Sequence, residues 1–271
     1  MLVRTWNLFH GNTSPPGRET FLDEMVRLAV ADQPAVVCLQ ELPVWALGRL
    51  AEWSGRTAVG VVGQPPSLGP FPATAEVGRV LTALNPGVLR SAFAGQANAV
   101  LLGPGLVLVE QRHVALNPFR FRRAQAHRLG LGLVARLAWG KERRVCQAIR
   151  VRREAQTFVI GNLHATSYRP DKRIADAELL RAAVFVDGFA LPHEPVLLGG
   201  DFNISVRRSR TLAELMTSDW GFGGATPTGI DHVLVRGAYA GDAHAWPAER
   251  RTRDGRLLSD HAPVDVEVEM A

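Results

Sequence analysis

Short apolar runs that end abruptly in polar residues recur along the chain. They cover residues 2–6, 36–39, 158–163 and 196–198. Their length and near-continuous apolar character are typical of buried strands. Ligand sites in α/β folds favour the loops beyond strand ends, because the rigid scaffold there holds polar groups that the core would not tolerate. We therefore expect the chemistry of this protein where these runs stop.

Two apolar stripes with spacings of three and four residues predict helices. The first stripe contains Phe21, Leu22, Met25, Val26 and Ala29, and the second contains Ile174, Ala177, Leu180 and Val184. Asp171 is expected to cap the second helix.

The middle of the chain is rich in Val and Leu and carries few helical signals. We predict strands near residues 77–84, 97–102, 106–116, 129–138 and 144–151. Residues 264–270 alternate apolar and acidic side chains, which is the period-two pattern of a half-buried strand. Residues 63–74 contain four prolines and predict a loop rather than a linker. The expected organisation is one α/β domain over residues 1–271.

Composition excludes several classes of protein. The chain is 46% apolar and 21% charged, which is ordinary for a folded domain. No uninterrupted apolar segment is long enough to span a membrane, and the N-terminus lacks the pattern of an export signal, so we expect a cytoplasmic protein. Cys38 and Cys146 are the only cysteines, which provides neither a disulfide framework nor the ligand spacing of a zinc site.

Arginine dominates the positive charge. Lys141 and Lys172 are the only lysines among 31 basic residues, and the net charge is +5. Arginine favours bidentate contacts with phosphate. An arginine-rich codon bias would explain the same composition equally well.

Asp201 and Asn203 follow one of the buried runs and two glycines, Gly199 and Gly200. The glycines permit a tight turn and the close approach of a ligand. An Asp-x-Asn pair can also simply close a turn, since both side chains bond to their own backbone.

Further polar groups lie at other predicted strand ends. Glu41 follows residues 36–39, where a buried carboxylate needs water, a salt bridge or a metal ion as its partner. The complete set contains Asn7, Glu41, His164, Asp201, Asn203, Asp231, Asp260 and His261. Its many oxygen donors, two histidines and lack of thiols suit Mg²⁺ or Mn²⁺ better than zinc.

Six short motifs in order give the chain its resemblance to a known family. They are Thr5-Trp6-Asn7, Leu39-Gln40-Glu41, Asn162-Leu163-His164-Ala165, Gly200-Asp201-Phe202-Asn203, Ile230-Asp231-His232-Val233 and Ser259-Asp260-His261. In these motifs the chain resembles the endonuclease/exonuclease/phosphatase (DNase I-like) superfamily over nearly its whole length. The resemblance implies a four-layer α/β/β/α sandwich, with two packed β-sheets flanked by helices.

The resemblance also implies a division of labour for a metal-dependent phosphoesterase. Glu41, with Asn7 and Asp260 close by, would hold the metal ion, and Asp201 would orient and deprotonate the attacking water. Asn203 would donate to the phosphoryl oxygens. Asp231 would bond to His261, and His261 would contact the phosphate. His164 would assist from the opposite side.

The substrate is less clear from the sequence. Residues 207–210 and 250–253 are basic and adjoin the motifs, so we expect Arg207 and Arg208 near the mouth of the site. Residues 119–128 mix aromatic residues with arginines, which is typical either of a single-strand binder or of a solvated loop. In place of the Thr-Lys usual in abasic-site endonucleases, Leu42-Pro43 follows Glu41, and this disfavours a repair enzyme.

We therefore expect nucleic acid as the substrate, cleaved by an endo- or exonuclease. The alternative is a phosphatase or phospholipase C-type hydrolase that acts on small-molecule or lipid phosphate esters. A non-catalytic nucleic-acid-binding relative is a third possibility. No obligate protein partner is inferred.

Overall fold

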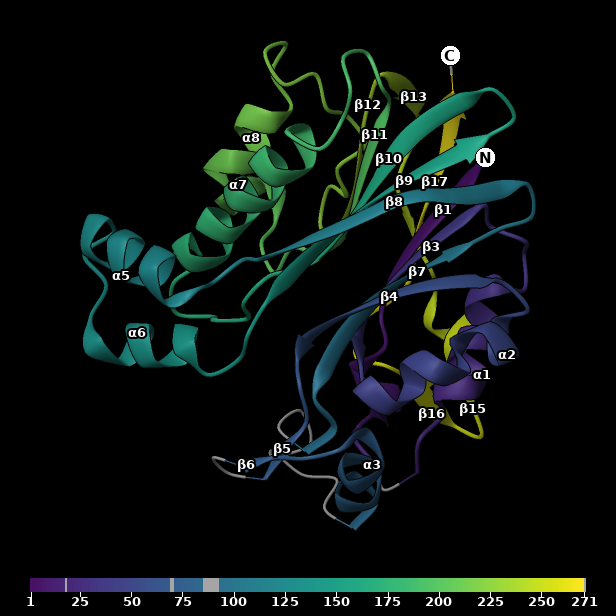
Figure 1. Ribbon diagram of the computed structural model, residues 1–271, viewed down its shortest axis with the longest axis vertical. Helices are drawn as coiled ribbons and strands as arrows, with labels where there is room; N and C mark the ends of the chain where they lie inside the picture. Colours follow the sequence, from purple (N-terminus) through teal and green to yellow (C-terminus); the bar gives the residue numbers. More distant parts are fainter. Residues whose placement is uncertain (18, 69–70, 85–92, 271) are drawn as a thin grey trace.

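Two large β-sheets pack face to face, with helices on both outer surfaces, in a computed structural model of the chain (Figure 1). The structure describes residues 1–17, 19–68, 71–84 and 93–270. Within these ranges no helix combines the length and the apolar character needed to cross a membrane.

The first sheet has the strand order β13-β17-β1-β3-β7-β4, with β14 paired to β17. β1 and β3 are parallel neighbours, whereas β17 and β7 run antiparallel to them. The strands of this sheet are β1 (Leu2–Asn7), β3 (Val36–Leu42), β4 (Thr57–Gln64), β7 (Gln96–Leu102), β13 (Ala238–Ala240), β14 (His244–Ala245) and β17 (Val264–Met270).

The second sheet has the order β12-β11-β10-β9-β8, in which only β10 and β11 are parallel. Its strands are β8 (Leu106–Ala115), β9 (Val145–Arg153), β10 (Gln156–His164), β11 (Val196–Asp201) and β12 (Asp231–Arg236). Smaller pairings join β2 (Thr13–Ser14), β15 (Thr252–Arg253) and β16 (Arg256–Leu258), and separately β5 (Ser67–Leu68) and β6 (Phe71–Pro72).

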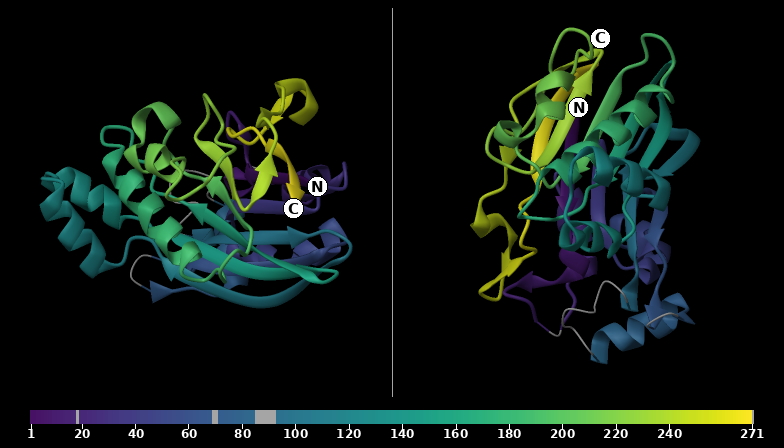
Figure 2. Two further views of the ribbon diagram at one scale, coloured as in Figure 1. Left: turned by 90° about the horizontal axis from the view of Figure 1, so that it is seen from above. Right: turned by 90° about the vertical axis from the view of Figure 1, so that its left-hand side faces the viewer.

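Helices cover the outer face of each sheet. The first sheet is covered by α1 (Leu22–Val30), α2 (Leu50–Ser54) and η2 (Val44–Arg49), and the second by α7 (Arg173–Asp187) and α8 (Arg210–Leu215). The other helices among the described residues are η1 (Phe9–Gly11), α3 (Ala75–Leu84), α5 (Phe119–Arg128), α6 (Leu133–Gly140), η3 (Val206–Arg208) and η4 (Ala248–Arg251). In the view from above, the teal pair α5 and α6 projects from one end of the sheets (Figure 2).

Strand alternation divides the apolar residues among three cores. On β3, Val36 and Cys38 face the other sheet, whereas Val37 and Leu39 face the helices. A third core lies between the second sheet and α7 with α8. These layers confirm the predicted four-layer α/β/β/α sandwich.

Two predicted strands are helices in the structure. Residues 77–84 lie in α3 and residues 129–138 lie largely in α6. Short apolar runs fit either a strand or a buried helix, and these two lack a neighbouring strand to pair with. On α6 the inward-facing side chains Ala135 and Trp139 are four residues apart, and Leu131, just before the helix, continues this spacing. This is the helical signal that the Leu-rich composition concealed.

The predicted stripe on α7 is also wrong in part. Ile174 is buried, but Leu180 is 37% and Val184 is 55% exposed. The buried face instead carries Ala175, Leu179, Ala182, Ala183 and Val186. Three of these buried residues are alanines, whereas Leu180 and Val184 lie on the outer side of the helix. Asp171 accepts a hydrogen bond from the Arg173 amide at the start of the helix.

A buried asparagine ties the two sheets together. Asn162 of β10 donates to the backbone oxygens of Leu39 and Ala99 in the first sheet, at 3.1 and 2.9 Å. Its side-chain oxygen accepts from Gln40 Nε2 at 2.8 Å. All three bonds lie out of contact with water, so the partners would find no replacement if this side chain were removed.

We predict that Asn162→Leu lowers the free energy of unfolding by about 3 kcal/mol, because it leaves several buried polar groups unpaired. Urea denaturation monitored by circular dichroism measures the change. Asn98→Leu is the matched control, because buried Asn98 donates one bond, to Val145 O. Asn98→Leu should lower the free energy of unfolding by about 1 kcal/mol. Equal losses in the two variants would contradict the inter-sheet role of Asn162.

Candidate active site

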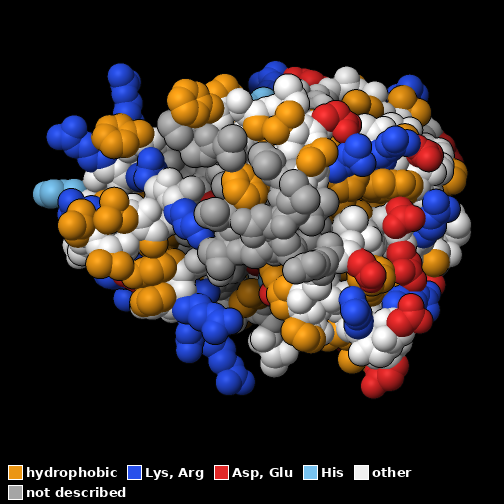
Figure 3. All heavy atoms as spheres, turned by 90° about the horizontal axis from the view of Figure 1, so that it is seen from below, with side chains coloured by type: hydrophobic (Ala, Val, Ile, Leu, Met, Phe, Trp, Pro, Cys, Tyr) orange, Lys and Arg blue, Asp and Glu red, His pale blue; other side chains and the backbone are white. Residues whose placement is uncertain are grey.

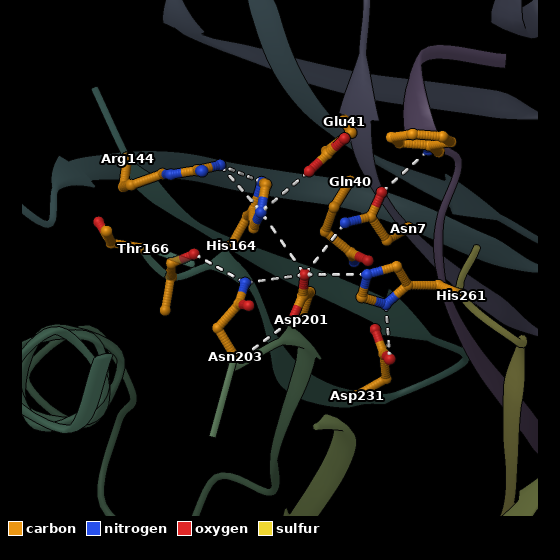
Figure 4. A network of polar contacts seen from close by, with 12 residues as sticks. Asn7, Gln40, Glu41, Arg144, His164, Thr166, Asp201, Asn203, Asp231 and His261 are labelled. Atoms are coloured by element: carbon orange, nitrogen blue, oxygen red, sulfur yellow. Dashed lines mark hydrogen bonds and ion pairs between the residues drawn. The ribbon is translucent and has the colours of Figure 1, made fainter. Parts of the chain in front are cut away.

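The chemically competent side chains converge at one edge of the paired sheets. Parallel β1 and β3 bring their carboxyl ends together in the first sheet, and parallel β10 and β11 do so in the second. The residues that meet there are Asn7, Glu41, His164, Asp201, Asn203, Asp231 and His261 (Figure 4). Alternation along the strands turns the side chains of Asn7, His164 and Asp201 into the space between the sheets.

The carboxylate of Asp201 lies at the centre of this group. The residue is 1% exposed and ends β11. Its Oδ2 accepts hydrogen bonds from Asn7 Nδ2 and Asn203 Nδ2, each at 3.0 Å. The backbone amide of Asn203 donates to Oδ1 at 2.9 Å. Burial raises the pKa of Asp201, whereas His261 and these hydrogen bonds lower it.

Gly200 makes the strand end possible. Its φ is +141°, and a Cβ atom at this position would lie 1.9 Å from Leu163 O. No other residue fits so close to the neighbouring strand. The requirement explains why a glycine precedes the central aspartate.

Asp231 and His261 form a bonded pair beside Asp201. His261 Nδ1 donates to Asp231 Oδ2 at 2.8 Å, and Nε2 lies 3.8 Å from Asp201 Oδ2. Burial disfavours the imidazolium, but the carboxylates of Asp201 and Asp231 outweigh it and raise the pKa of His261 to about 11. The ring is therefore protonated at neutral pH.

The turn before β17 fixes His261 in place. Ser259 has φ +60°, and its hydroxyl donates to Asn7 O and accepts from the His261 amide. Trp6 Nε1 donates to His261 O at 3.0 Å. These contacts hold the histidine against the end of β1, which is distant in the sequence.

The sequence led us to expect Glu41 directly after a strand. The residue instead lies inside β3. The ladder to β7 is irregular between Leu39 and Leu42, and Glu41 has φ +52°. Strict alternation would turn Glu41 toward the helices. The bulge instead brings its Oε1 to 3.4 Å from His164 Nε2 in the second sheet.

The surroundings of Glu41 suit a cation. Burial raises its pKa from 4.5 to about 7, and Arg144, His261 and Asn7 only partly offset this rise. A carboxylate in such a place gains from a positive charge at close range. Asn7 Oδ1 accepts one hydrogen bond, from the Phe9 amide, which leaves its second lone pair for a ligand. The pair of oxygen donors is of the kind that Mg²⁺ and Mn²⁺ prefer.

A second group of possible metal ligands is formed by Asp201, Asp231 and His261, whose ligand atoms lie within 4.8 Å of one another. Asp231 Oδ1 is buried and has no hydrogen-bond partner within the described residues. His261, however, is bonded through Nδ1 to Asp231 and is protonated, and an imidazolium cannot ligate a metal ion. The position between Asn7 and Glu41 is therefore the better fit.

His164 sits between the carboxylates of Glu41 and Asp201. Its Nε2 is 3.4 Å from Glu41 and 3.5 Å from Asp201. Burial lowers the pKa of His164 well below 6.5, and the nearby charge of Arg144 adds to the effect. The ring is neutral, so these contacts are not ion pairs.

Asp260, Arg207 and Arg208 lie at the margin of the site. Asp260 is exposed, and its side chain makes no hydrogen bond or ion pair to any residue that the structure describes, although its charge helps to raise the pKa of His261. Arg207 and Arg208 are exposed in η3. Lys172 donates to Asn203 O at 2.8 Å, and its pKa is lowered mainly by burial and further by the nearby charges of Arg208 and Arg169.

The basic residues 250–253 do not line the mouth. Arg251 donates to the backbone oxygens of Leu258 and Ser259, so it supports the turn before His261. Arg250 pairs with Asp32 and stacks on the Trp246 ring, and Arg253 pairs with Glu24. Residues 119–128 form helix α5 rather than a loop.

Sequence reasoning missed Arg144, which is 5% exposed at the start of β9. Its Nη1 lies 2.8 and 2.9 Å from the two ring nitrogens of His164, and it pairs with Glu142. The β9–β10 hairpin brings Arg144 to this place, and no short motif marks it. The one signal was a charged residue directly beside a buried strand.

The amide of Asn203 is fully engaged within the protein. Its Nδ2 donates to Ala165 O and to Asp201 Oδ2, both at 3.0 Å. Both hydrogen atoms are therefore used, and a contact with a phosphoryl oxygen requires one of these two bonds to be exchanged.

Comparisons with known proteins identify the family and the fold. The model of the Endonuclease/Exonuclease/phosphatase family matches residues 5–261. A search of curated proteins finds no match. Many solved structures share the fold.

An endonuclease/exonuclease/phosphatase from Bacteroides vulgatus is 12% identical, with a TM-score of 0.68 and coverage of 100% of this chain and 98% of that one. The Bacteroides thetaiotaomicron mannosyl-6-phosphatase is 14% identical, with a TM-score of 0.65 and 99% of each chain covered. The human Nocturnin catalytic domain is 14% identical, with a TM-score of 0.64 and coverage of 100% and 93%. With six motifs at one sheet edge and a family match over nearly its whole length, the chain belongs to the endonuclease/exonuclease/phosphatase family.

Proposed function

We propose that this protein is a divalent-metal-dependent phosphodiesterase that cleaves nucleic acid by the attack of an activated water. Members of its family are hydrolases that act on phosphoester bonds, and they typically require a divalent metal. The proposal rests above all on the buried carboxylate of Asp201, which is oriented by two asparagines and flanked by a neutral and a protonated histidine.

Asp201 is placed to act as the base. Its two amide donors fix the carboxylate plane, so the remaining lone pairs point in defined directions. Burial raises its pKa, which increases its basicity toward water. The charged His261 at 3.8 Å lowers the pKa of Asp201 and so opposes part of the effect of burial.

Glu41, Asn7 and the exposed Asp260 would hold the metal ion. When bound, a divalent cation polarises a phosphoryl oxygen and stabilises the charge of the leaving oxygen. Glu41 would lose its proton when the metal ion binds, because its pKa of about 7 reflects burial with no metal ion beside it.

Protonated His261 would donate from Nε2 to the phosphate, while Asp231 holds the ring through Nδ1. Asn203 would exchange its bond to Asp201 for one to a phosphoryl oxygen as negative charge develops there. Neutral His164 would accept or donate a hydrogen bond from the other side, kept neutral by burial and by Arg144.

Nucleic acid is the proposed substrate because basic groups lie next to the reaction centre. Lys172, Arg169 and Arg208 gather beside the Asp201–Asn203 turn, where they would bind neighbouring phosphates of a polyanion. A second candidate is a lipid phosphate ester. It is favoured by the aliphatic residues that α6 exposes to solvent.

Hydrolysis of a plasmid, single-stranded DNA, RNA, phosphoinositide and sphingomyelin panel with Mg²⁺ or Mn²⁺ tests the function. On nucleic acid we expect the rate to fall steeply with added salt, as phosphate contacts are screened. Turnover of a phosphomonoester or lipid alone, with little dependence on salt, would contradict the nuclease proposal. Absence of hydrolysis across the panel would contradict the phosphoesterase proposal itself.

We predict that Asp201→Asn lowers kcat by about a thousandfold or more, because the amide cannot accept the proton of water. The variant should keep the circular dichroism spectrum and unfolding midpoint of the wild type. Exposed Asp219 provides the matched control, and Asp219→Asn should leave kcat unchanged. Near-normal turnover by Asp201→Asn would rule out its role as the base.

We predict that Glu41→Gln stabilises the metal-free protein in a pH-dependent way. The folded pKa of about 7 exceeds the unfolded value of 4.5, so the folded state binds the proton more tightly. The free energy of unfolding therefore falls as pH rises from 4.5 through 7, by up to about 3 kcal/mol. In EDTA the free energy of unfolding of the variant should exceed that of the wild type near about pH 8, and the difference should disappear near about pH 4.

Urea denaturation across this pH range measures the effect, with exposed Glu52→Gln as the control. Added Mg²⁺ should stabilise the wild type but not Glu41→Gln. An equal response of both proteins to Mg²⁺ would show that Glu41 does not bind the metal.

A further inference from the structure

Helix α6 has apolar residues on both its covered and its uncovered face, and its only charged residue is Arg136. Trp139 and Ala135 pack in a small core with Ala126 and Ile174. The opposite face carries Leu133, Val134 and Leu137, which are 72, 72 and 67% exposed. A helix that borders water normally has polar residues on its outer side, whereas one that is apolar all round is covered. The outer face of α6 is therefore built for contact with another surface.

Positive charge surrounds this face. Residues 119–141 contain five arginines and one lysine, and no Asp or Glu occurs between Glu110 and Glu142. Arg120, Arg123, Arg128 and Arg136 are exposed. Phe119, at the start of α5, is 68% exposed. We call Phe119, Leu133, Val134 and Leu137 with these four arginines the α5–α6 surface.

The α5–α6 surface lies at one end of the molecule. Seen from below, hydrophobic and basic side chains gather at the end where α5 and α6 project, while most acidic side chains lie at the other end (Figure 3). This uneven distribution of charge would turn the α5–α6 end of the protein toward an extended, negatively charged partner.

We propose that the α5–α6 surface binds a lipid bilayer that carries anionic headgroups. Leu133, Val134 and Leu137 would enter the boundary of the acyl chains, and the arginines would contact lipid phosphates and carboxylates. Nucleic acid would engage the arginines but offers no apolar layer to aliphatic side chains. A second copy of the chain would bring the two arginine groups against each other.

The α5–α6 surface is held in a fixed relation to the reaction centre. Trp139 Nε1 donates to Glu178 Oε1 at 2.5 Å, and Glu178 accepts from the amide and hydroxyl of Thr166, at 2.6 and 2.8 Å. Thr166 follows His164 by two residues and lies beside Asn203 (Figure 4). Binding a bilayer through α6 would thus set the orientation of the site, whichever ester the site hydrolyses.

Co-sedimentation with vesicles tests the proposal. We expect binding to phosphatidylcholine vesicles that contain about one third phosphatidylserine, weak binding to phosphatidylcholine alone, and loss of binding at high salt. Val134→Gln/Leu137→Gln should lower the partition coefficient at least about tenfold, because the apolar contacts are lost. Arg120→Gln/Arg123→Gln should lower binding to anionic vesicles only.

Val107→Gln/Leu191→Gln is the matched control, since these residues are 51 and 57% exposed outside the α5–α6 surface. It should bind like the wild type. All variants should keep the wild-type circular dichroism spectrum and their hydrolysis of bis(p-nitrophenyl) phosphate, which separates vesicle binding from the proposed function. Equal binding to both kinds of vesicle, or unchanged binding of Val134→Gln/Leu137→Gln, would overturn the proposal.

Two further results would also overturn it. One is a dimer in light scattering that Val134→Gln/Leu137→Gln dissociates, combined with no vesicle binding. The other is an oligonucleotide complex that Arg120→Gln/Arg123→Gln weakens, again with no vesicle binding.

Discussion

The carboxylate of Asp201 is almost excluded from water, and the free energy that its charge would cost in isolation constrains everything around it. Asn7 arrives from the first sheet, Asn203 from the following turn and His261 from the segment before β17. Each of these groups offsets part of the cost. The contacts from Asn7 and His261 tie two distant segments of the chain to one strand end, so the fold and the candidate site share their interactions.

Much of the fold was predictable because its strands are buried on both faces or alternate regularly. Residues 2–6, 158–163 and 264–270 pair nearly where their patterns indicate, and the six motifs lie at one sheet edge. The failures have one physical origin. In α3, α6 and α7 the sequence shows which residues are apolar, but only tertiary packing decides which of them are covered, as the exposed Val184 shows.

The candidate residues could be picked from the sequence, and the structure brings most of them together, but their contacts could not be predicted. Glu41 reaches the space between the sheets only through a bulge, and periodicity cannot place a bulge. Arg144 becomes a neighbour of His164 through the pairing of β9 with β10, and it determines the charge state of that ring together with burial. Nor could the sequence show that the Asn203 amide is already occupied.

The hydrogen bonds of Glu178 determine which face of α6 can be substituted without affecting the rest of the protein. It is a buried carboxylate whose partners, Trp139 and Thr166, belong to the projecting helices and to the segment after β10. These hydrogen bonds connect the inner face of α6 to the segment after β10, whereas the outer face of α6 contacts none of these groups. The two faces are separable modules. Substitutions on the outer face would change the α5–α6 surface while the hydrogen bonds of Glu178 stay in place.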